Sequence, residues 1–184
     1  YYNKPNQQGL FQHYKAINDA VNIPQILYNV PSRTGCDLEN ETVISLSQLK
    51  NIIGVKDATG ELERIDFMKG KVKNNFTFIS GDDLSFLGYM ERGAKAVISV
   101  TANVKPDLMH IICNSMLNGD IEKSKNLNKQ LSNLHKAMFV DSNPIPVKWL
   151  MTYLGLINKG IRLPLVELDK KYQKTLIEIF EAIK

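Results

Sequence analysis

Cysteine is scarce in this sequence of 184 residues, and long apolar runs are missing. The two cysteines, Cys36 and Cys113, stand far apart and form no paired spacing. This argues against a disulfide framework or a cysteine-based zinc site and is typical of a reducing compartment, so we expect a cytoplasmic protein. No stretch is long and apolar enough to cross a bilayer, which argues against a membrane partner.

Blocks of like charge and common ligand motifs are also missing. The net charge is +4, but the lysines are scattered among acidic residues, as on solvated helix faces, so we expect no nucleic-acid partner. The stretch 54–60 lacks the Gly-Lys-Ser/Thr signature of a phosphate-binding loop. The three histidines lie in helical patterns and share no ligand spacing with Asp57, Asp82 or Asp83. We therefore expect no metal site.

What the sequence does have is four apolar, β-rich runs. They occupy residues 24–30, 52–55, 76–80 and 94–100. Each is continuous rather than alternating, which predicts strands that are covered on both faces. Helical patterns lie between the runs, so the order predicts parallel strands joined by right-handed crossover helices.

After Val100 only helical patterns remain. We predict a boundary near Gly119, with βα units in residues 1–119 and an α-helical C-terminal subdomain in residues 120–184. Four strands are half the number in a (β/α)8 barrel, which typically needs about 250 residues. The predicted fold class is therefore α/β, with about half of a TIM barrel followed by helices.

A single lysine inside an apolar run is the first candidate for chemistry. Lys56 directly follows residues 52–55 at the end of this strand, and barrel enzymes hold their catalytic groups at the C-terminal ends of their strands. Loss of hydration disfavours the charged form of an amine, and a neutral amine attacks carbonyl carbon. Lys56 is thus a candidate Schiff-base lysine; the alternative is a strand-end lysine that extends into solvent.

Three further candidates follow neighbouring strands. Tyr28 ends the preceding strand, about 4.8 Å away, and its phenol would pass protons unless it is only a core tyrosine. Arg33 lies in a Pro-Ser-Arg-Thr-Gly loop, where a guanidinium would bind a carboxylate through two parallel hydrogen bonds or would simply be exposed. Gly81 lets backbone approach a ligand, or is an ordinary turn glycine.

Five blocks in order then resemble a known family. They are Tyr-Asn-Val-Pro-Ser-Arg-Thr-Gly (28–35), Gly-Val-Lys-Asp-Ala-Thr-Gly (54–60), Ser-Gly-Asp-Asp (80–83), Val-Ile-Ser-Val-Thr-Ala-Asn-Val (97–104) and Asn-Pro-Ile-Pro-Val-Lys-Trp (143–149). They resemble the 4-hydroxy-tetrahydrodipicolinate (dihydrodipicolinate) synthase family, within the superfamily of pyruvate-dependent lyases. The resemblance runs through the whole chain. The loop of Arg33 separates this family from the sialic acid lyases.

The resemblance implies strands five to eight of the barrel and a condensation of pyruvate with aspartate semialdehyde in lysine biosynthesis. Lys56 would form an imine with pyruvate, and Tyr28 would shuttle protons. Arg33 would hold the carboxylate of the semialdehyde, while Gly81 and Ile98 would line the pyruvate pocket. No metal or organic cofactor is implied, because the lysine itself is the electron sink.

Two N-terminal tyrosines match the family by position only. Tyr2 corresponds to a tyrosine that crosses a dimer interface into the neighbour's active site and joins a proton relay. Tyr1 corresponds to a residue at the lysine feedback site on that interface. The resemblance also implies a homotetramer, a dimer of dimers in which the C-terminal helices make tetramer contacts.

The resemblance places the family's first four βα units outside this sequence. The strands 24–30 and 94–100 would then be bare edges, which template aggregation, so we expect the chain alone to be poorly soluble or to associate. Three origins fit this expectation: a fragment of a longer enzyme, the product of a split or decayed gene, or a half-barrel that pairs with itself or with a separate half.

Two other functions stay open on the sequence. One is a different pyruvate-dependent lyase or aldolase, acting on N-acetylneuraminate or on a 2-keto-3-deoxy sugar acid. The other is a non-catalytic remnant that only self-associates.

Overall fold

The structure is a computed structural model that describes residues 2–183. The chain divides between Ile98 and Ser99 into two units. The boundary that the sequence predicts near Gly119 falls between helices α6 (Pro106–Leu117) and α7 (Ile121–Ala137). These two helices pack against each other, so the division lies earlier in the chain than predicted.

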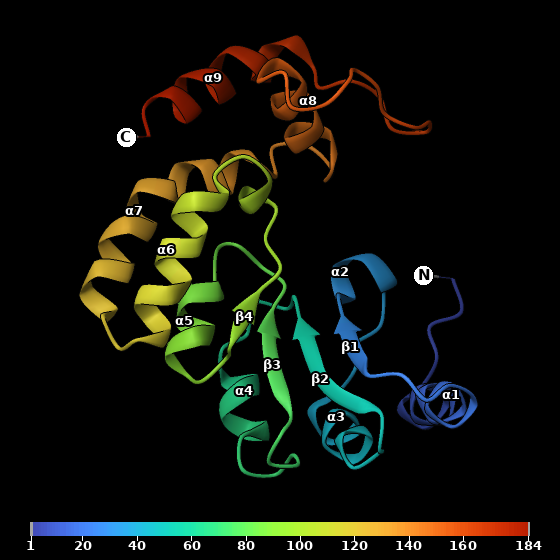
Figure 1. Cartoon of the computed structure of the whole chain (residues 1–184). Helices are drawn as coiled ribbons and strands as arrows, with labels where there is room; N and C mark the ends of the chain where they lie inside the picture. The colour runs from blue at the N-terminus through green and yellow to red at the C-terminus, as the bar shows by residue number, and fades with distance from the viewer. Residues whose placement is uncertain (1, 184) are drawn as a thin grey trace. The chain divides into compact units, whose positions relative to one another are not determined.

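Four parallel strands in the order β1-β2-β3-β4 form the sheet of the first unit (Figure 1). They are β1 (Gln25–Asn29), β2 (Ile52–Asp57), β3 (Thr77–Ser80) and β4 (Ala96–Val97). Each crossover advances by one strand, which confirms the predicted βα repetition. Strand β4 is much shorter than the apolar run 94–100. Its partner β3 ends at Ser80, and the Ser80 carbonyl accepts the last hydrogen bond between the two strands, from the Ile98 N–H.

Helix α1 (Gln7–Ala20) precedes β1, and shorter helices connect the strands. These are α2 (Pro31–Thr34), α3 (Asn40–Ser47), α4 (Glu63–Met68) and α5 (Phe86–Glu91). Helix α3 contacts β2, α5 contacts β3, and α3 also contacts α4. Their buried side chains, among them Leu46, Ile65 and Phe86, form the core between these helices and one face of the sheet.

The opposite face of β1 is open. Side chains alternate along this strand, with Leu27 and Asn29 buried while Ile26 and Tyr28 are 47% and 44% exposed. The prediction that the strands are covered on both faces is therefore wrong for β1. The apolar run of β1 shows no alternation in the sequence, because apolar residues occupy both its buried and its exposed face. Within residues 2–183, β1 and β4 each pair with one neighbouring strand only, so both are edge strands of this sheet, as expected.

The second unit is helical, as predicted, within residues 99–183. It contains the 3-10 helix η1 (Thr101–Asn103), α6, α7, α8 (Ile145–Tyr153) and α9 (Lys170–Glu181). In its core, the Thr101 hydroxyl lies 2.7 Å from His135 Nδ1, and His135 Nε2 lies 3.2 Å from the side-chain oxygen of Asn128. His135 is thus a hydrogen-bonded core histidine.

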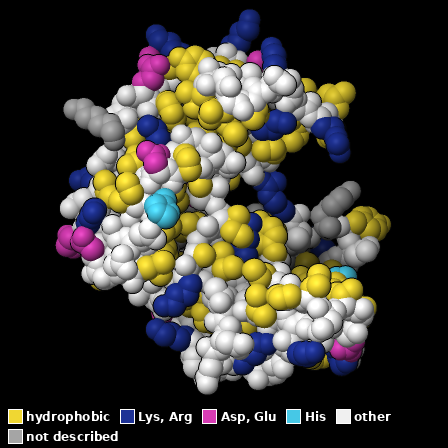
Figure 2. Space-filling view, viewed as in Figure 1, with side chains coloured by type: hydrophobic (Ala, Val, Ile, Leu, Met, Phe, Trp, Pro, Cys, Tyr) yellow, Lys and Arg dark blue, Asp and Glu magenta, His cyan; other side chains and the backbone are white. Residues whose placement is uncertain are grey.

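Surface features fit the composition. On the face shown in Figure 2, lysine and arginine side chains are scattered rather than gathered into one block. None of the helices in the described part of the chain combines the length and apolar character that a membrane span requires.

Candidate active site

Lys56 and Tyr28 meet at the carboxyl ends of neighbouring parallel strands. The register of the sheet pairs Tyr28 with Lys56, and Lys56 with Ile79. The Lys56 ammonium nitrogen lies 3.8 Å from the centroid of the Tyr28 ring, a cation–π contact. Lys56 is half-buried and lies against the exposed Tyr28 side chain. The amine therefore lies over the ring face, and proton transfer through the phenol requires it to move toward the hydroxyl.

Gly81 leaves room for the lysine side chain. A Cβ atom at this position would lie 2.9 Å from Lys56 Cε and 2.9 Å from the Ala58 Cβ, closer than real Cβ atoms approach. The Gly81 N–H also donates to the Asp57 carbonyl at 2.7 Å, which fixes the turn against the end of β2. The role of this glycine toward Lys56 is steric.

The sequence predicts an imine of pyruvate at Lys56, and we expect Gly81→Ala to slow its formation by up to about 10²-fold, because the added methyl displaces the amine from its position. The measurement is the rate at which borohydride traps pyruvate on Lys56. Gly88→Ala is the control, because its methyl would crowd only the flexible end of Leu62, and it should leave the rate unchanged. A Gly81→Ala chain that traps pyruvate at the original rate contradicts the steric role.

Arg33 lies on a short helix whose ends are set by sequence. Pro31 occupies the first turn of α2, and Gly35 ends it in the left-handed conformation at φ 72°. The Arg33 side chain is exposed, and no ion pair or hydrogen bond of its guanidinium is found within residues 2–183. Its donors are therefore available to a ligand carboxylate.

The other predicted site residues lie as follows. Ile98 directly follows β4 and is 54% exposed, at the same sheet edge as Gly81. Tyr2 precedes α1 and is 86% exposed, so the first unit does not bury it. Tyr1 lies outside the described residues. The roles of these residues stay predictions.

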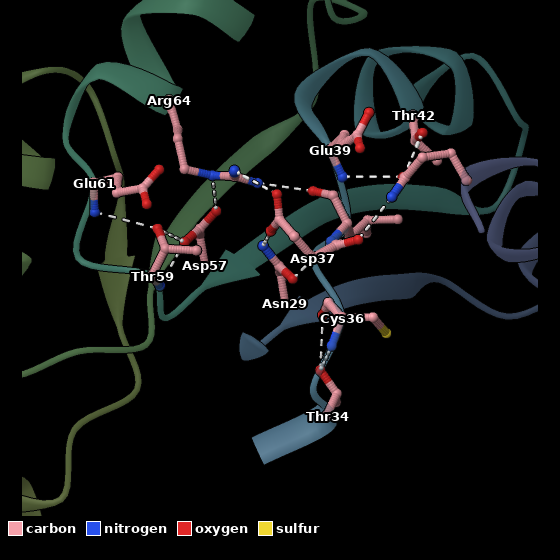
Figure 3. A network of polar contacts seen from close by, with 12 residues as sticks. Asn29, Thr34, Cys36, Asp37, Glu39, Thr42, Asp57, Thr59, Glu61 and Arg64 are labelled. Atoms are coloured by element: carbon pink, nitrogen blue, oxygen red, sulfur yellow. Dashed lines mark hydrogen bonds and ion pairs between the residues drawn. The ribbon is translucent and has the colours of Figure 1, made fainter. Parts of the chain in front are cut away.

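A buried polar network lies beside this edge and has no counterpart in the sequence analysis (Figure 3). Arg64 of α4 is its centre, with Nε 2.9 Å from Asp57 Oδ2 and Nη1 2.9 Å from Asp37 Oδ2. Asp57 Oδ1 accepts hydrogen bonds from the N–H and the hydroxyl of Thr59 at 2.8 and 2.6 Å. The signal that was available is an arginine directly before the apolar Ile65, in the helical pattern between the second and third β-rich runs.

Arg64 is a cation in this setting. Burial by itself lowers the pKa of its guanidinium, but the carboxylates of Asp57 and Asp37 outweigh burial, so the pKa of Arg64 is raised overall. One buried cation thus faces two carboxylates, that of Asp57, which is buried, and that of Asp37, which is partly exposed. In the described part of the chain, no group of three or more His, Cys, Asp or Glu side chains is arranged to hold a metal ion.

Comparisons with known proteins bear on this arrangement. A 4-hydroxy-tetrahydrodipicolinate synthase of Buchnera aphidicola is 54% identical over 166 residues, which are 90% of this chain and 56% of that protein. The structure of a dihydrodipicolinate synthase from Acinetobacter baumannii, complexed with pyruvate, is 47% identical with a TM-score of 0.94 and covers 100% of this chain and 63% of that one. A monomeric dihydrodipicolinate synthase variant is 37% identical, with a TM-score of 0.94 over 99% of this chain and 62% of that one.

The chain spans about three fifths of the length of these relatives. The structural match confirms the predicted fold class, the C-terminal portion of a (β/α)8 barrel followed by helices. The model of the dihydrodipicolinate synthetase family matches residues 1–183. With its strand order, its lysine–tyrosine pair and this match, the chain belongs to the dihydrodipicolinate synthetase family.

Proposed function

We propose that this chain carries the Schiff-base part of a 4-hydroxy-tetrahydrodipicolinate synthase site, which condenses pyruvate with L-aspartate 4-semialdehyde in the diaminopimelate route of lysine biosynthesis. The observation that carries the proposal is the Lys56 amine, held 3.8 Å above the Tyr28 ring at the carboxyl edge of a parallel sheet. The names of the relatives support it, as does the pyruvate bound to the enzyme of Acinetobacter baumannii.

The chemistry begins with a nucleophilic amine. The ring face of Tyr28 attracts the ammonium form of Lys56, so its proton must leave before the nitrogen attacks the ketone carbon of pyruvate. Once the amine has moved from the ring face toward the hydroxyl, the adjacent phenol relays that proton and helps to expel water from the carbinolamine. The imine then loses a methyl proton and becomes an enamine.

The second substrate reacts with that enamine. The enamine carbon attacks the aldehyde carbon of aspartate semialdehyde, whose carboxylate the exposed Arg33 binds as a planar fork. The amino group of the semialdehyde then attacks the imine carbon, closes the ring and releases Lys56. Gly81 and Ile98 border the space in which pyruvate sits.

The complete site, we infer, is assembled in a cytoplasmic homo-oligomer, a tetramer built as a dimer of dimers. The 86% exposure of Tyr2 supports this, because a tyrosine that enters a neighbour's site must leave its own subunit. Tyr1 would contribute to a lysine site at the same interface. The two free cysteines fit a reducing compartment.

The test is reductive trapping. The 184-residue chain is incubated with pyruvate, reduced with borohydride and digested, and the adduct is located by mass spectrometry. We expect one adduct per chain, on Lys56. No adduct on a folded chain overturns the proposal in favour of a non-catalytic remnant. Formation of the heterocyclic product, rather than cleavage of N-acetylneuraminate or a 2-keto-3-deoxy sugar acid, separates the synthase from its related lyases.

Tyr28→Phe tests the proton relay apart from the ring contact. Phenylalanine keeps a ring under the Lys56 amine but removes the hydroxyl, so we expect imine formation to slow by about 10²–10⁴-fold while the lysine stays in place. Rapid quenching with borohydride at successive times gives the rate constant. A rate within twofold of the original chain rules out the relay.

A further inference from the structure

We propose that Arg64 is a positioning residue: it fastens the loop that follows Arg33 to the strand end that carries Lys56, and so fixes the distance between the amine and the carboxylate-binding guanidinium. This inference rests on the proposed function. It assigns a role to a buried side chain that contacts neither substrate.

Arg64 uses three donors of one planar group to join two segments (Figure 3). Its Nε donates to Asp57 Oδ2 at 2.9 Å, and Asp57 is the residue directly after Lys56. Its Nη1 donates to Asp37 Oδ2 at 2.9 Å and its Nη2 to the Leu38 carbonyl at 2.7 Å. Asp37 and Leu38 lie in the loop that continues from α2, the helix of Arg33.

The strand of Tyr28 is tied to the same loop. The amide nitrogen of Asn29 donates to Asp37 Oδ1 at 2.7 Å, and the amide oxygen of Asn29 accepts from the Leu38 N–H at 3.0 Å. Successive residues of a strand point to opposite faces. Asn29 and Asp57 therefore point away from the open face that carries Tyr28 and Lys56, and the network fixes both strand ends from behind.

The loop is the part that depends on Arg64. The end of β2 is also held by backbone bonds, from the Ala58 N–H to the Asn29 carbonyl at 2.9 Å and from the Gly81 N–H to the Asp57 carbonyl at 2.7 Å. The loop at Asp37 is held by side chains instead: Arg64 and Asn29 bind the Asp37 carboxylate, and Gln7 donates to the Asp37 carbonyl at 2.8 Å from the other side. Loss of the guanidinium fork should therefore move the loop and leave the lysine strand in place.

Arginine is the side chain that this geometry requires. A lysine at the same position has one ammonium nitrogen and cannot reach Asp57, Asp37 and the Leu38 carbonyl together. Arg64→Lys therefore keeps the positive charge beside Asp57 but no longer joins the strand end to the loop at Asp37. The matched control is Arg92→Lys, because Arg92 pairs with Asp66 at 2.9 Å on the solvent-exposed side of the same unit and has no link to the loop.

The two cysteines give a readout that does not depend on catalysis. Cys36 lies in the loop directly before Asp37, and Cys113 lies on α6 of the second unit; both are free thiols. Limited reaction with a thiol reagent, quantified by mass spectrometry at each cysteine, compares local opening of the loop with opening elsewhere. In Arg64→Lys we expect Cys36 to react about tenfold faster and Cys113 to react at the original rate, as the loss of charge-assisted hydrogen bonds predicts. Arg92→Lys should change neither.

A second readout separates the two substrates. In Arg64→Lys, the pyruvate concentration that gives half-maximal trapping on Lys56 should stay within about twofold, because the strand end is held by its ladder. The concentration of aspartate semialdehyde that halves the yield of trapped adduct, by consuming the enamine before borohydride is added, should rise about tenfold, because the loop of Arg33 is no longer fixed. A variant that is only less stable should lose both in parallel.

Each outcome decides something. An unchanged rate at Cys36 in Arg64→Lys overturns the inference, as does a rise at Cys36 and Cys113 together. A parallel loss for both substrates assigns Arg64 to stability alone and also overturns it. If the original chain forms no adduct on Lys56, the proposed function fails, while the comparison of Cys36 with Cys113 still decides whether Arg64 holds the loop.

Discussion

Lys56→Arg should abolish the pyruvate adduct. Arginine keeps a cation over the Tyr28 ring, but its guanidinium stays protonated and does not attack a ketone, so trapping should fall to the background seen without pyruvate. The measurement is the intact mass of the chain after borohydride reduction, with peptide mapping of any residual adduct. The loss should exceed that of Tyr28→Phe, because a slowed proton relay still permits an imine whereas the absence of an amine does not.

Lys95→Arg is the matched control for this result. Lys95 is an exposed lysine directly before β4 in the same unit, and its replacement should leave the adduct yield unchanged. If Lys56→Arg still gives a full adduct that maps to other lysines, the trapping is non-specific and Lys56 has no special reactivity.

The ends of β1 and β2 could be predicted from the sequence, because they depend on local pattern. The run that ends at Lys56 predicts its own strand, and a parallel register then places Tyr28 beside it. The length of the fourth strand could not be predicted from its own sequence. The strand stops after Ile98 because its neighbour, β3, ends at Ser80 and offers no further hydrogen-bond partner. The open face of β1 was hidden for another reason: Ile26 is as apolar as the buried Leu27, so no alternation marks the exposed side.

Arg64 escaped prediction because its partners are distant in the sequence. Asp37 lies 27 positions before it, and nothing in the spacing shows that the two side chains meet. An arginine on a helix with many polar neighbours is ordinarily solvated, and only the fold shows that this one is 8% exposed. The sequence therefore predicts which groups could perform the chemistry, while the groups that would hold them in place depend on tertiary contacts.

Asp57→Ala should strongly destabilise the first unit. Asp57 is 2% exposed, and its removal leaves the Arg64 guanidinium in the interior without one of its two carboxylates. Breaking a buried ion pair in this way costs about 3–5 kcal/mol of unfolding free energy. Asp66→Ala is the control, because its pair with Arg92 is solvent-exposed and should contribute only about 0–1 kcal/mol.

The measurement must report on the first unit. The single tryptophan, Trp149, belongs to α8 of the second unit, so its fluorescence would follow the wrong transition. Hydrogen exchange of the β2 amides, followed at increasing urea concentrations, reports on the strand that holds Asp57. The double variant Asp57→Leu with Arg64→Leu removes the buried ion pair as a whole, and only the partly exposed Asp37 carboxylate loses a partner, so it should be more stable than Asp57→Ala alone. If Asp57→Ala costs no more than Asp66→Ala, the charge cluster is not buried in solution, and the tie between the lysine strand and the arginine loop fails with it.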